Sequence, residues 1–146
     1  MKKVLSIALL FATSLCIIPS TNAQTLEDRR VNLPIQENSK YALLVDQTNY
    51  FMGAVSTGLQ FKEQHKQLEY EVVLIGSAVK ELATNQDLIP LIEQAARQQI
   101  RIVVCEMAMK KQGLDVSDFH DSILFTPNGF QYLWGLQDNG FKTIAL

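Results

Sequence analysis

Five short apolar runs constrain the fold of this chain more than any other feature of its sequence. They are rich in valine and isoleucine, which strands prefer, and they span 41–45, 70–76, 100–105, 122–126 and 141–145. The central runs are apolar on both faces, which suits a parallel sheet that is covered on both sides. Helical patterns separate them, so we expect an α/β fold with a doubly wound, five-stranded, mostly parallel sheet and helices on both faces.

The clearest helical pattern spans 87–99. Asp87 is the expected N-cap, and Pro90 falls in the first turn, where its missing N–H costs little. The apolar side chains recur at helical spacing and define one face, made of Leu88, Leu91, Ile92, Ala95 and Ala96.

Two further helices are expected. The segment 127–140 has Thr126 or Asn128 as its cap, and Asn139-Gly140 ends it. The segment 51–64 carries small residues that allow close approach to the sheet, namely Gly53, Ala54 and Gly58. Residues 106–121 predict only two short turns, one that ends at Gly113 and one around Asp115 to Asp118.

The first 23 residues have the layout of a secretory signal peptide. Lys2 and Lys3 precede an apolar run, Val4 to Ile18, and Thr21-Asn22-Ala23 offers a cleavage site. The run is shorter than the ~20 residues of a membrane span, which argues against an anchor. We therefore expect export, to a bacterial periplasm, followed by an irregular arm over 24–40 and one α/β domain over 41–146.

Charge and apolar runs limit the partners of the mature chain. Without Lys2 and Lys3, 11 basic residues face 15 acidic ones, a formal charge of about −4. This balance argues against nucleic acid as a partner. No later apolar run is long enough to span a membrane, so no membrane contact is expected after cleavage of the signal peptide.

Cysteine use points to one candidate residue. Cys16 lies in the signal segment, so Cys105 is the single thiol of the mature chain and has no partner for an internal disulfide. Free cysteines are among the most buried residues, but Cys105 ends the 100–105 run, where parallel sheets bind ligands. A helical turn follows at once, and its N–H groups and Lys110 and Lys111 favour a thiolate.

Other residues at the same edge of the predicted sheet are candidates for binding. They follow the first, third and fourth runs and are Asn49, Met107, Lys110, Asn128 and Gly129. No metal site is expected, because His65 and His120 lack ligand spacing. No cofactor is expected either, because the sequence has no glycine-rich phosphate loop of the G-x-x-x-x-G-K-[ST] or G-x-G-x-x-G type.

Two stretches, "RIVVCEMAMKKQGLDVSDF" and "ILFTPNGFQYLWGLQDNGFKTI", resemble the DsrE/DsrF-like family, which includes TusD-type sulfur-relay proteins. The resemblance runs from about Tyr41 to the last residue. It implies a flavodoxin-like fold and assembly into a homo-oligomer, either a trimer or a hexamer. Light scattering tests the expected oligomeric state. It also implies that Cys105 carries sulfur as a persulfide, and that donor and acceptor proteins or small sulfur compounds are its partners.

Two functional hypotheses follow from these observations. In the first, the protein is a periplasmic sulfur carrier or sulfurtransferase with Cys105 as the persulfide acceptor. In the second, it is a non-catalytic binding or assembly protein of the same fold, in which Cys105 is a packing residue. Reaction of the protein with a sulfane-sulfur donor separates the two.

Overall fold

The computed structural model describes residues 29–31 and 33–146. The chain divides into two compact units, Met1–Leu33 and Pro34–Leu146. The predicted signal peptide, 1–23, and the beginning of the predicted arm lie outside the described residues. Residues 33–39 contain no helix or strand. Among the described helices, none is long and apolar enough to cross a membrane.

The second unit is built on a five-stranded sheet in which every pair of neighbours is parallel. The strands lie in the order β4-β3-β2-β1-β5. Their bounds are β1 Lys40–Val45, β2 Glu69–Leu74, β3 Ile100–Cys105, β4 Leu124–Thr126 and β5 Lys142–Ala145. The predicted doubly wound α/β fold is confirmed, although β4 begins two residues later than the apolar run that predicted it.

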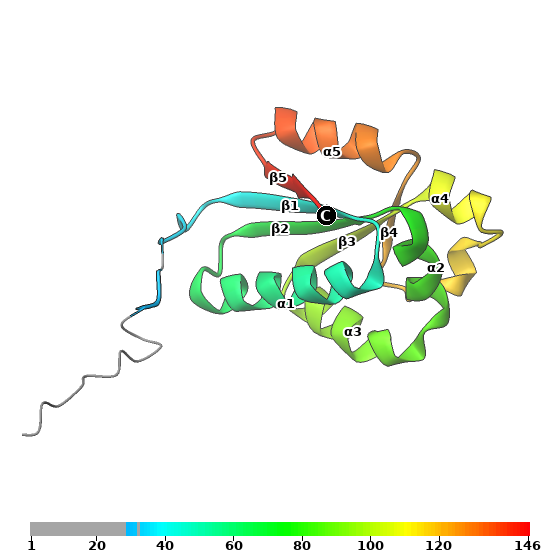
Figure 1. Ribbon diagram of the computed structural model, residues 1–146, viewed down its shortest axis with the longest axis horizontal. Coiled ribbons are helices and arrows are strands. Elements are labelled where there is room, and N and C mark those ends of the chain that lie inside the picture. Colours follow the sequence, from blue (N-terminus) through cyan, green and yellow to red (C-terminus); the bar gives the residue numbers. More distant parts are fainter. Residues whose placement is uncertain (1–28, 32) are drawn as a thin grey trace, which may run out of the picture. The chain divides into compact units, whose positions relative to one another are not determined.

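Helices cover the two faces of the sheet unequally (Figure 1). One face packs against α1 (Thr48–Gln64), α2 (Gly76–Thr84), α3 (Ile89–Arg97) and the short α4 (Glu106–Lys111). The other face packs against α5 (Gly129–Asp138), which contacts β1, β2, β3 and β5. Two 3-10 turns, Gln86–Leu88 and Val116–Asp118, complete the described elements.

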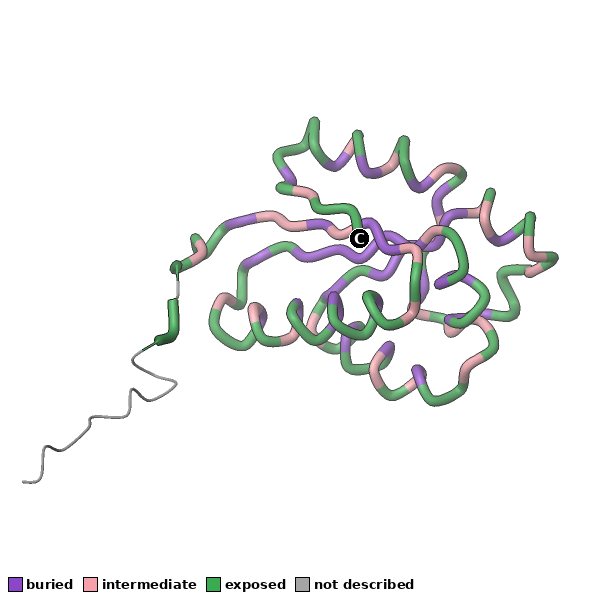
Figure 2. The backbone as a smooth tube through the Cα atoms, in the orientation of Figure 1, coloured by how far each residue is buried: buried purple, intermediate pink, exposed green. Residues whose placement is uncertain are grey.

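Side chains alternate between the two faces along each strand and so form two cores. The larger core joins Val72, Leu74, Ile102 and Val104 to α1, α2 and α3. The smaller core lies under α5 and contains Ala42, Leu44, Val73, Leu133, Leu136 and Phe141. The central strands β2 and β3 are therefore buried along most of their length, whereas the edge strands β4 and β5 are more exposed and the helices are buried on one side only (Figure 2).

Several local expectations changed in the structure. Asp87 does not cap α3; Asn85 caps the preceding 3-10 turn and accepts the N–H of Asp87 at 3.0 Å. Ala96 is exposed, so the buried face of α3 is narrower than the spacing of its apolar residues predicted. Asn128, rather than Thr126, caps α5. The helix α2 was missed, because its nine residues fill a short segment with no long apolar stripe.

Gly58 lets α1 lie close to the sheet. A Cβ atom at this position would lie 2.7 Å from two ring carbons of Tyr70. That ring is buried, and its hydroxyl donates to the carbonyl oxygen of Ala54 at 2.9 Å, so it has little freedom to move. Gly53, in the same helix, is exposed and has no atom near such a Cβ.

These two glycines give opposite predictions. We expect Gly58→Ala to lower the free energy of unfolding by about 1–3 kcal/mol, because the added methyl overpacks the core. Gly53→Ala should raise it by up to about 1 kcal/mol, because alanine is the better helix former. Urea denaturation of both variants measures the difference. Equal effects would contradict the close packing of α1 on Tyr70.

Candidate functional site

The connections that follow β3 and β4 leave the sheet on opposite faces. The connection from β3 to β4 runs through α4, whose Met109 belongs to the larger core. The connection from β4 to β5 runs through α5 on the opposite face. In open parallel sheets, the carboxyl ends of strands at such a switch point border a crevice where ligands bind. Cys105 ends β3 and pairs with Thr126, the last residue of β4.

A backbone N–H at the beginning of α5 reaches the thiol. Gly129 donates to Cys105 Sγ at 3.3 Å. A Cβ atom on Gly129 would lie 2.7 Å from Ile75 Cγ2 and 3.3 Å from Cys105 Cβ. Any larger residue would therefore push the first turn of α5 away from the sulfur. The Asn128 side chain fixes this turn by accepting the N–H groups of Phe130 and Gln131 at 3.0 and 3.4 Å.

The N–H that reaches the sulfur does not come from the helical turn that follows Cys105 in the sequence. Cys105 occupies the N-cap position of α4, but its side chain makes no capping hydrogen bond there. Its place in the strand alternation turns it toward the face that α5 covers. The contact therefore joins residues 24 positions apart, which local sequence reasoning missed.

A pocket of about 580 Å³ lies in front of Cys105. Its walls come from the ends of β2 and β3, the first turns of α2 and α5, and the whole length of α4. The lining residues are Ile75, Gly76, Ser77, Cys105, Met107, Ala108, Lys111, Gln112, Asn128 and Phe130. Cys105 itself is only 5% exposed, so the pocket is the route to its sulfur.

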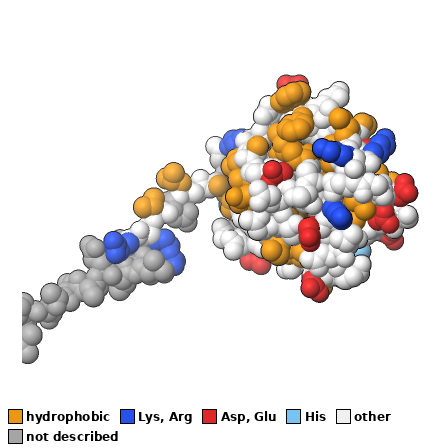
Figure 3. All heavy atoms as spheres, turned by 45° about the vertical axis from the view of Figure 1, so that its right-hand side comes forward, with side chains coloured by type: hydrophobic (Ala, Val, Ile, Leu, Met, Phe, Trp, Pro, Cys, Tyr) orange, Lys and Arg blue, Asp and Glu red, His pale blue; other side chains and the backbone are white. Residues whose placement is uncertain are grey.

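The surface around this edge of the molecule is notably apolar. Met107 is 61% exposed and Phe130 is 51% exposed, although both are large hydrophobic residues. Figure 3 brings forward the side of the molecule that carries α4, and hydrophobic side chains gather on its upper part with Lys and Arg side chains beside them. Exposed apolar groups beside a pocket are a common feature of binding sites.

The structure brings together some of the predicted site residues and separates others. Met107 and Asn128 line the pocket with Cys105, and Gly129 contacts the sulfur. Asn49 is exposed in the first turn of α1 and does not line the pocket. Lys110 also lies outside the lining and pairs with Glu106 at 3.3 Å.

Seven of the ten lining residues were not predicted as binding residues, and Lys111, Gln112 and Phe130 are the most informative of them. Lys111 takes the place expected of Lys110. The amide nitrogen of Gln112 donates to Gly76 O at 2.7 Å and to Ala108 O at 3.1 Å, which joins α4 to the beginning of α2. Phe130 is half exposed beside the pocket, and its position in the helical pattern does not reveal this.

His120 takes no part in this pocket. Its Nδ1 lies 2.9 Å from Ser122 Oγ, and it lines a separate cavity with residues of α2 and α3. Among the described residues, no group of three or more His, Cys, Asp or Glu side chains could hold a metal ion.

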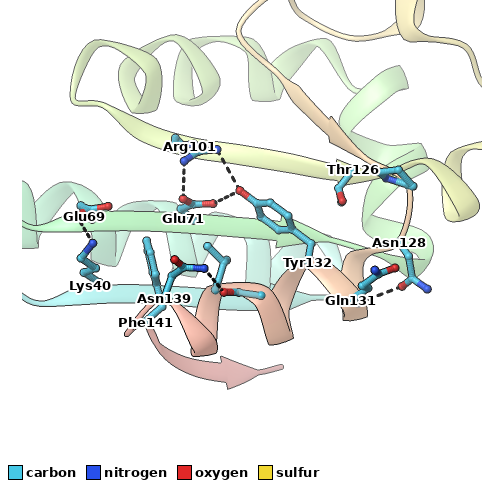
Figure 4. A pocket seen from close by; sticks show the side chains of 13 residues that line it. Lys40, Glu69, Glu71, Arg101, Thr126, Asn128, Gln131, Tyr132, Asn139 and Phe141 are labelled. Carbon is cyan, nitrogen blue, oxygen red and sulfur yellow. Dashed lines mark hydrogen bonds and ion pairs between the residues drawn. The ribbon is translucent and has the colours of Figure 1, made fainter.

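A second pocket, of about 590 Å³, lies between α5 and the sheet (Figure 4). Its centre is a cluster of Glu71, Arg101 and Tyr132. Arg101 Nη1 lies 2.9 Å from Glu71 Oε1, and the Tyr132 hydroxyl donates to Glu71 Oε2 at 2.8 Å. Arg101 Nη2 donates to the Tyr132 hydroxyl oxygen at 3.0 Å, which closes the cluster.

Burial sets the acid–base properties of this cluster. Glu71 is only 1% exposed, and desolvation raises the pKa of its carboxyl above 4.5, although Tyr132 and Arg101 lower it. Burial, with the hydrogen bond to Glu71, raises the pKa of Tyr132 to about 12. Because all these charged and polar groups satisfy one another, the cluster joins α5 to β2 and β3.

Comparison with known proteins identifies the family. The model of the DsrE/DsrF-like family matches residues 36–146. The chain belongs to the DsrE/DsrF-like family. Membership suggests sulfur relay at the level of the family, and it confirms the resemblance seen in the sequence. No curated protein matches this sequence.

Three solved structures share the fold. MTH1491 from Methanobacterium thermoautotrophicum, a protein of unknown function, is 15% identical, with a TM-score of 0.67 over 74% of this chain and 99% of its own. BT1422 from Bacteroides thetaiotaomicron is 20% identical, with a TM-score of 0.62 over 78% and 100%. YchN from E. coli is 14% identical, with a TM-score of 0.57 over 72% and 99%. At these identities the similarity shows the fold alone.

The raised pKa of Glu71 predicts a pH-dependent stability. The folded state binds this proton more tightly than the unfolded state, so the group stabilises the fold most below pH 4.5 and less as pH rises through the folded-state pKa. We expect Glu71→Gln to remove this decline. Urea denaturation from about pH 4 to pH 7 measures it.

Glu69→Gln is the matched control for this prediction. Glu69 is the neighbouring, exposed acid on β2 and pairs with Lys40 at 2.8 Å. The decline in stability with rising pH should persist in this variant, slightly reduced, because the Glu69 charge adds to the effect of burial on the pKa of Glu71. Parallel pH profiles for the wild type and Glu71→Gln would show that Glu71 is not the group responsible.

Proposed function

We propose that the protein is a periplasmic sulfur carrier or sulfurtransferase in which Cys105 accepts sulfane sulfur as a persulfide. The observation that carries this proposal is the position of Cys105 Sγ, which lies at a pocket and accepts the N–H of Gly129. Membership of the DsrE/DsrF-like family, which suggests sulfur relay, supports the same chemistry.

The surroundings of Cys105 suit a nucleophilic thiolate. A backbone N–H and the beginning of a ten-residue helix, α5, both favour negative charge on the sulfur. The thiolate attacks the outer sulfur of a donor, a new S–S bond forms, and the donor leaves as a thiolate. An acceptor thiolate then takes the outer sulfur and restores Cys105.

Burial favours the alternative in which Cys105 only packs. At 5% exposure it resembles the many inert cysteines of protein cores. The same burial also suits a carrier, because a persulfide that is reached only through a mostly apolar pocket is protected from other oxidants and thiols. Direct reaction with a donor decides between these two roles.

Export is part of the proposal and rests on the signal-like pattern of residues 1–23. Cleavage after Ala23 gives Gln24 as the first residue of the mature protein. N-terminal sequencing of the protein from its native host should find Gln24, and retention of Met1 in the purified protein would argue against export by this route.

The carrier role predicts that Cys105 gains sulfur. After the full chain is incubated with polysulfide, the peptide that contains Cys105 should gain about 32 Da per sulfur, and dithiothreitol should remove the gain. Cys105→Ser should abolish the reaction. Its free energy of unfolding should fall by about 1–3 kcal/mol, because serine is the more polar residue at a buried site.

The second cysteine of the sequence provides the control. Cys16→Ser should leave the gain of mass at Cys105 unchanged. Intact-protein and peptide mass spectrometry follow both variants. A wild-type protein that shows no gain at Cys105, while free cysteine in the same tube is converted, would contradict the carrier role.

A further inference from the structure

We propose that the pocket in front of Cys105 selects a small organic persulfide that bears an anionic group as its sulfur donor. This inference rests on the proposed carrier function and adds the class of donor. It is carried by the size of the pocket, the chemistry of its walls and the one charge among its lining residues.

The depth of the sulfur and the size of the pocket favour a small donor. The pocket, of about 580 Å³, lies in the range typical of small-molecule sites. Cys105 is 5% exposed at the end of a buried strand, so a small molecule reaches its Sγ more readily than a cysteine fixed on the surface of a folded protein does. A slender molecule that enters the pocket can reach it.

The walls favour an organic donor over an inorganic one. Ile75, Met107, Ala108 and Phe130 supply apolar surface, and Met107 and Phe130 are more than half exposed in the structure. An organic group bound there would remove this surface from water, which is favourable. Inorganic polysulfide carries no apolar group and gains nothing from these side chains.

Lys111 favours a donor with negative charge. It is the one charged residue among the ten that line the pocket, and no acidic side chain is among them. Its neighbour Lys110 pairs with Glu106 at 3.3 Å, whereas Lys111 has no ion-pair partner in the described part of the chain. A carboxylate on the donor would therefore meet an unpaired ammonium group at the pocket.

The transfer balances without a further oxidant or reductant. The Cys105 thiolate attacks the outer sulfur of R–S–SH, and the S–S bond of the donor breaks as the new S–S bond forms. The products are Cys105–S–SH and the thiolate R–S⁻, which leaves with the electron pair of the broken bond. The charged group and the apolar part of R bind the pocket and take no part in the reaction.

The test compares three donors on the full chain. They are the persulfide of N-acetylcysteine, the persulfide of its methyl ester, which lacks the carboxylate, and inorganic polysulfide. For each donor, the gain of mass of the peptide that contains Cys105 is followed over time and gives the rate of sulfur transfer. Each rate is divided by the rate for the urea-unfolded chain, which removes differences in the intrinsic reactivity of the donors.

Two pairs of variants isolate the two parts of the pocket. Phe130→Ala removes an apolar wall, and Trp134→Ala is its control, because Trp134 is also exposed on α5 but does not line the pocket. Lys111→Gln removes the charge, and Lys110→Gln is its control. Met107→Ala, on a different helix, tests the apolar wall independently if Phe130→Ala impairs folding.

We expect saturable transfer from N-acetylcysteine persulfide, at a normalised rate well above those for the ester and for polysulfide. Lys111→Gln should reduce the ratio of the acid rate to the ester rate by about three- to fivefold. This factor corresponds to the free energy of one partly exposed charge pair. Phe130→Ala should slow the organic donors at least about threefold, with little effect on polysulfide. Both controls should behave like the wild type.

The contrary outcomes separate this inference from the carrier function. If polysulfide loads Cys105 as well as the organic donors do, and neither Phe130→Ala nor Lys111→Gln changes the ratios, the donor class is wrong and the carrier function stands. The same holds if only a protein persulfide loads Cys105. If no donor loads Cys105, both proposals fail.

Discussion

The change of face at the end of β4 determines where everything at the candidate site lies. Up to β4, each crossover packs its helix on the same face of the sheet, but β5 pairs with β1 at the far edge. The chain must therefore return across the sheet, and it does so as α5 on the opposite face. This return begins beside Cys105, so the first N–H of α5 meets the sulfur at 3.3 Å.

The position of α5 in turn depends on a few contacts with the sheet. Leu133 and Leu136 bury its apolar side in a core much smaller than the one on the other face. The Tyr132 hydroxyl adds a hydrogen bond to Glu71, whose charge Arg101 balances. Burying a charged group of this kind costs desolvation energy. Its hydrogen-bond and ion-pair partners compensate for that cost only in a specific geometry. The cluster thus fixes the register of α5 on the sheet, and with it the distance from Gly129 to Cys105.

Much of the fold could be predicted from the sequence, because it depends on local patterns. The five β-branched runs located the strands, and the Asn128 cap and Gly140 bounded α5 closely. The pattern failed where tertiary contacts decide. Nothing near Asp87 in the sequence reveals that Asn85 begins a 3-10 turn there, and α2 is too short to show a clear apolar face.

The candidate site was predictable only in part for the same reason. The end of a central strand located Cys105, and the carboxyl edge of the sheet located Met107 and Asn128. Whether Lys110 or Lys111 lines the pocket depends on how the six-residue helix α4 is rotated about its axis. The sequence does not determine this rotation. The contact between Gly129 and Cys105 and the cluster around Glu71 join distant parts of the chain, and no local pattern marks them.

The central claim is that the Cys105 thiol reacts in the folded protein, and its alkylation by iodoacetamide at pH 7 tests this most directly. The rate at Cys105, followed by peptide mass spectrometry, is compared between the folded chain and the same chain in urea. We expect Cys105 to be labelled in the folded state, because the pocket gives a small reagent access to the sulfur beside the Gly129 N–H. Labelling of Cys105 only after unfolding would contradict it and would make Cys105 a packing residue.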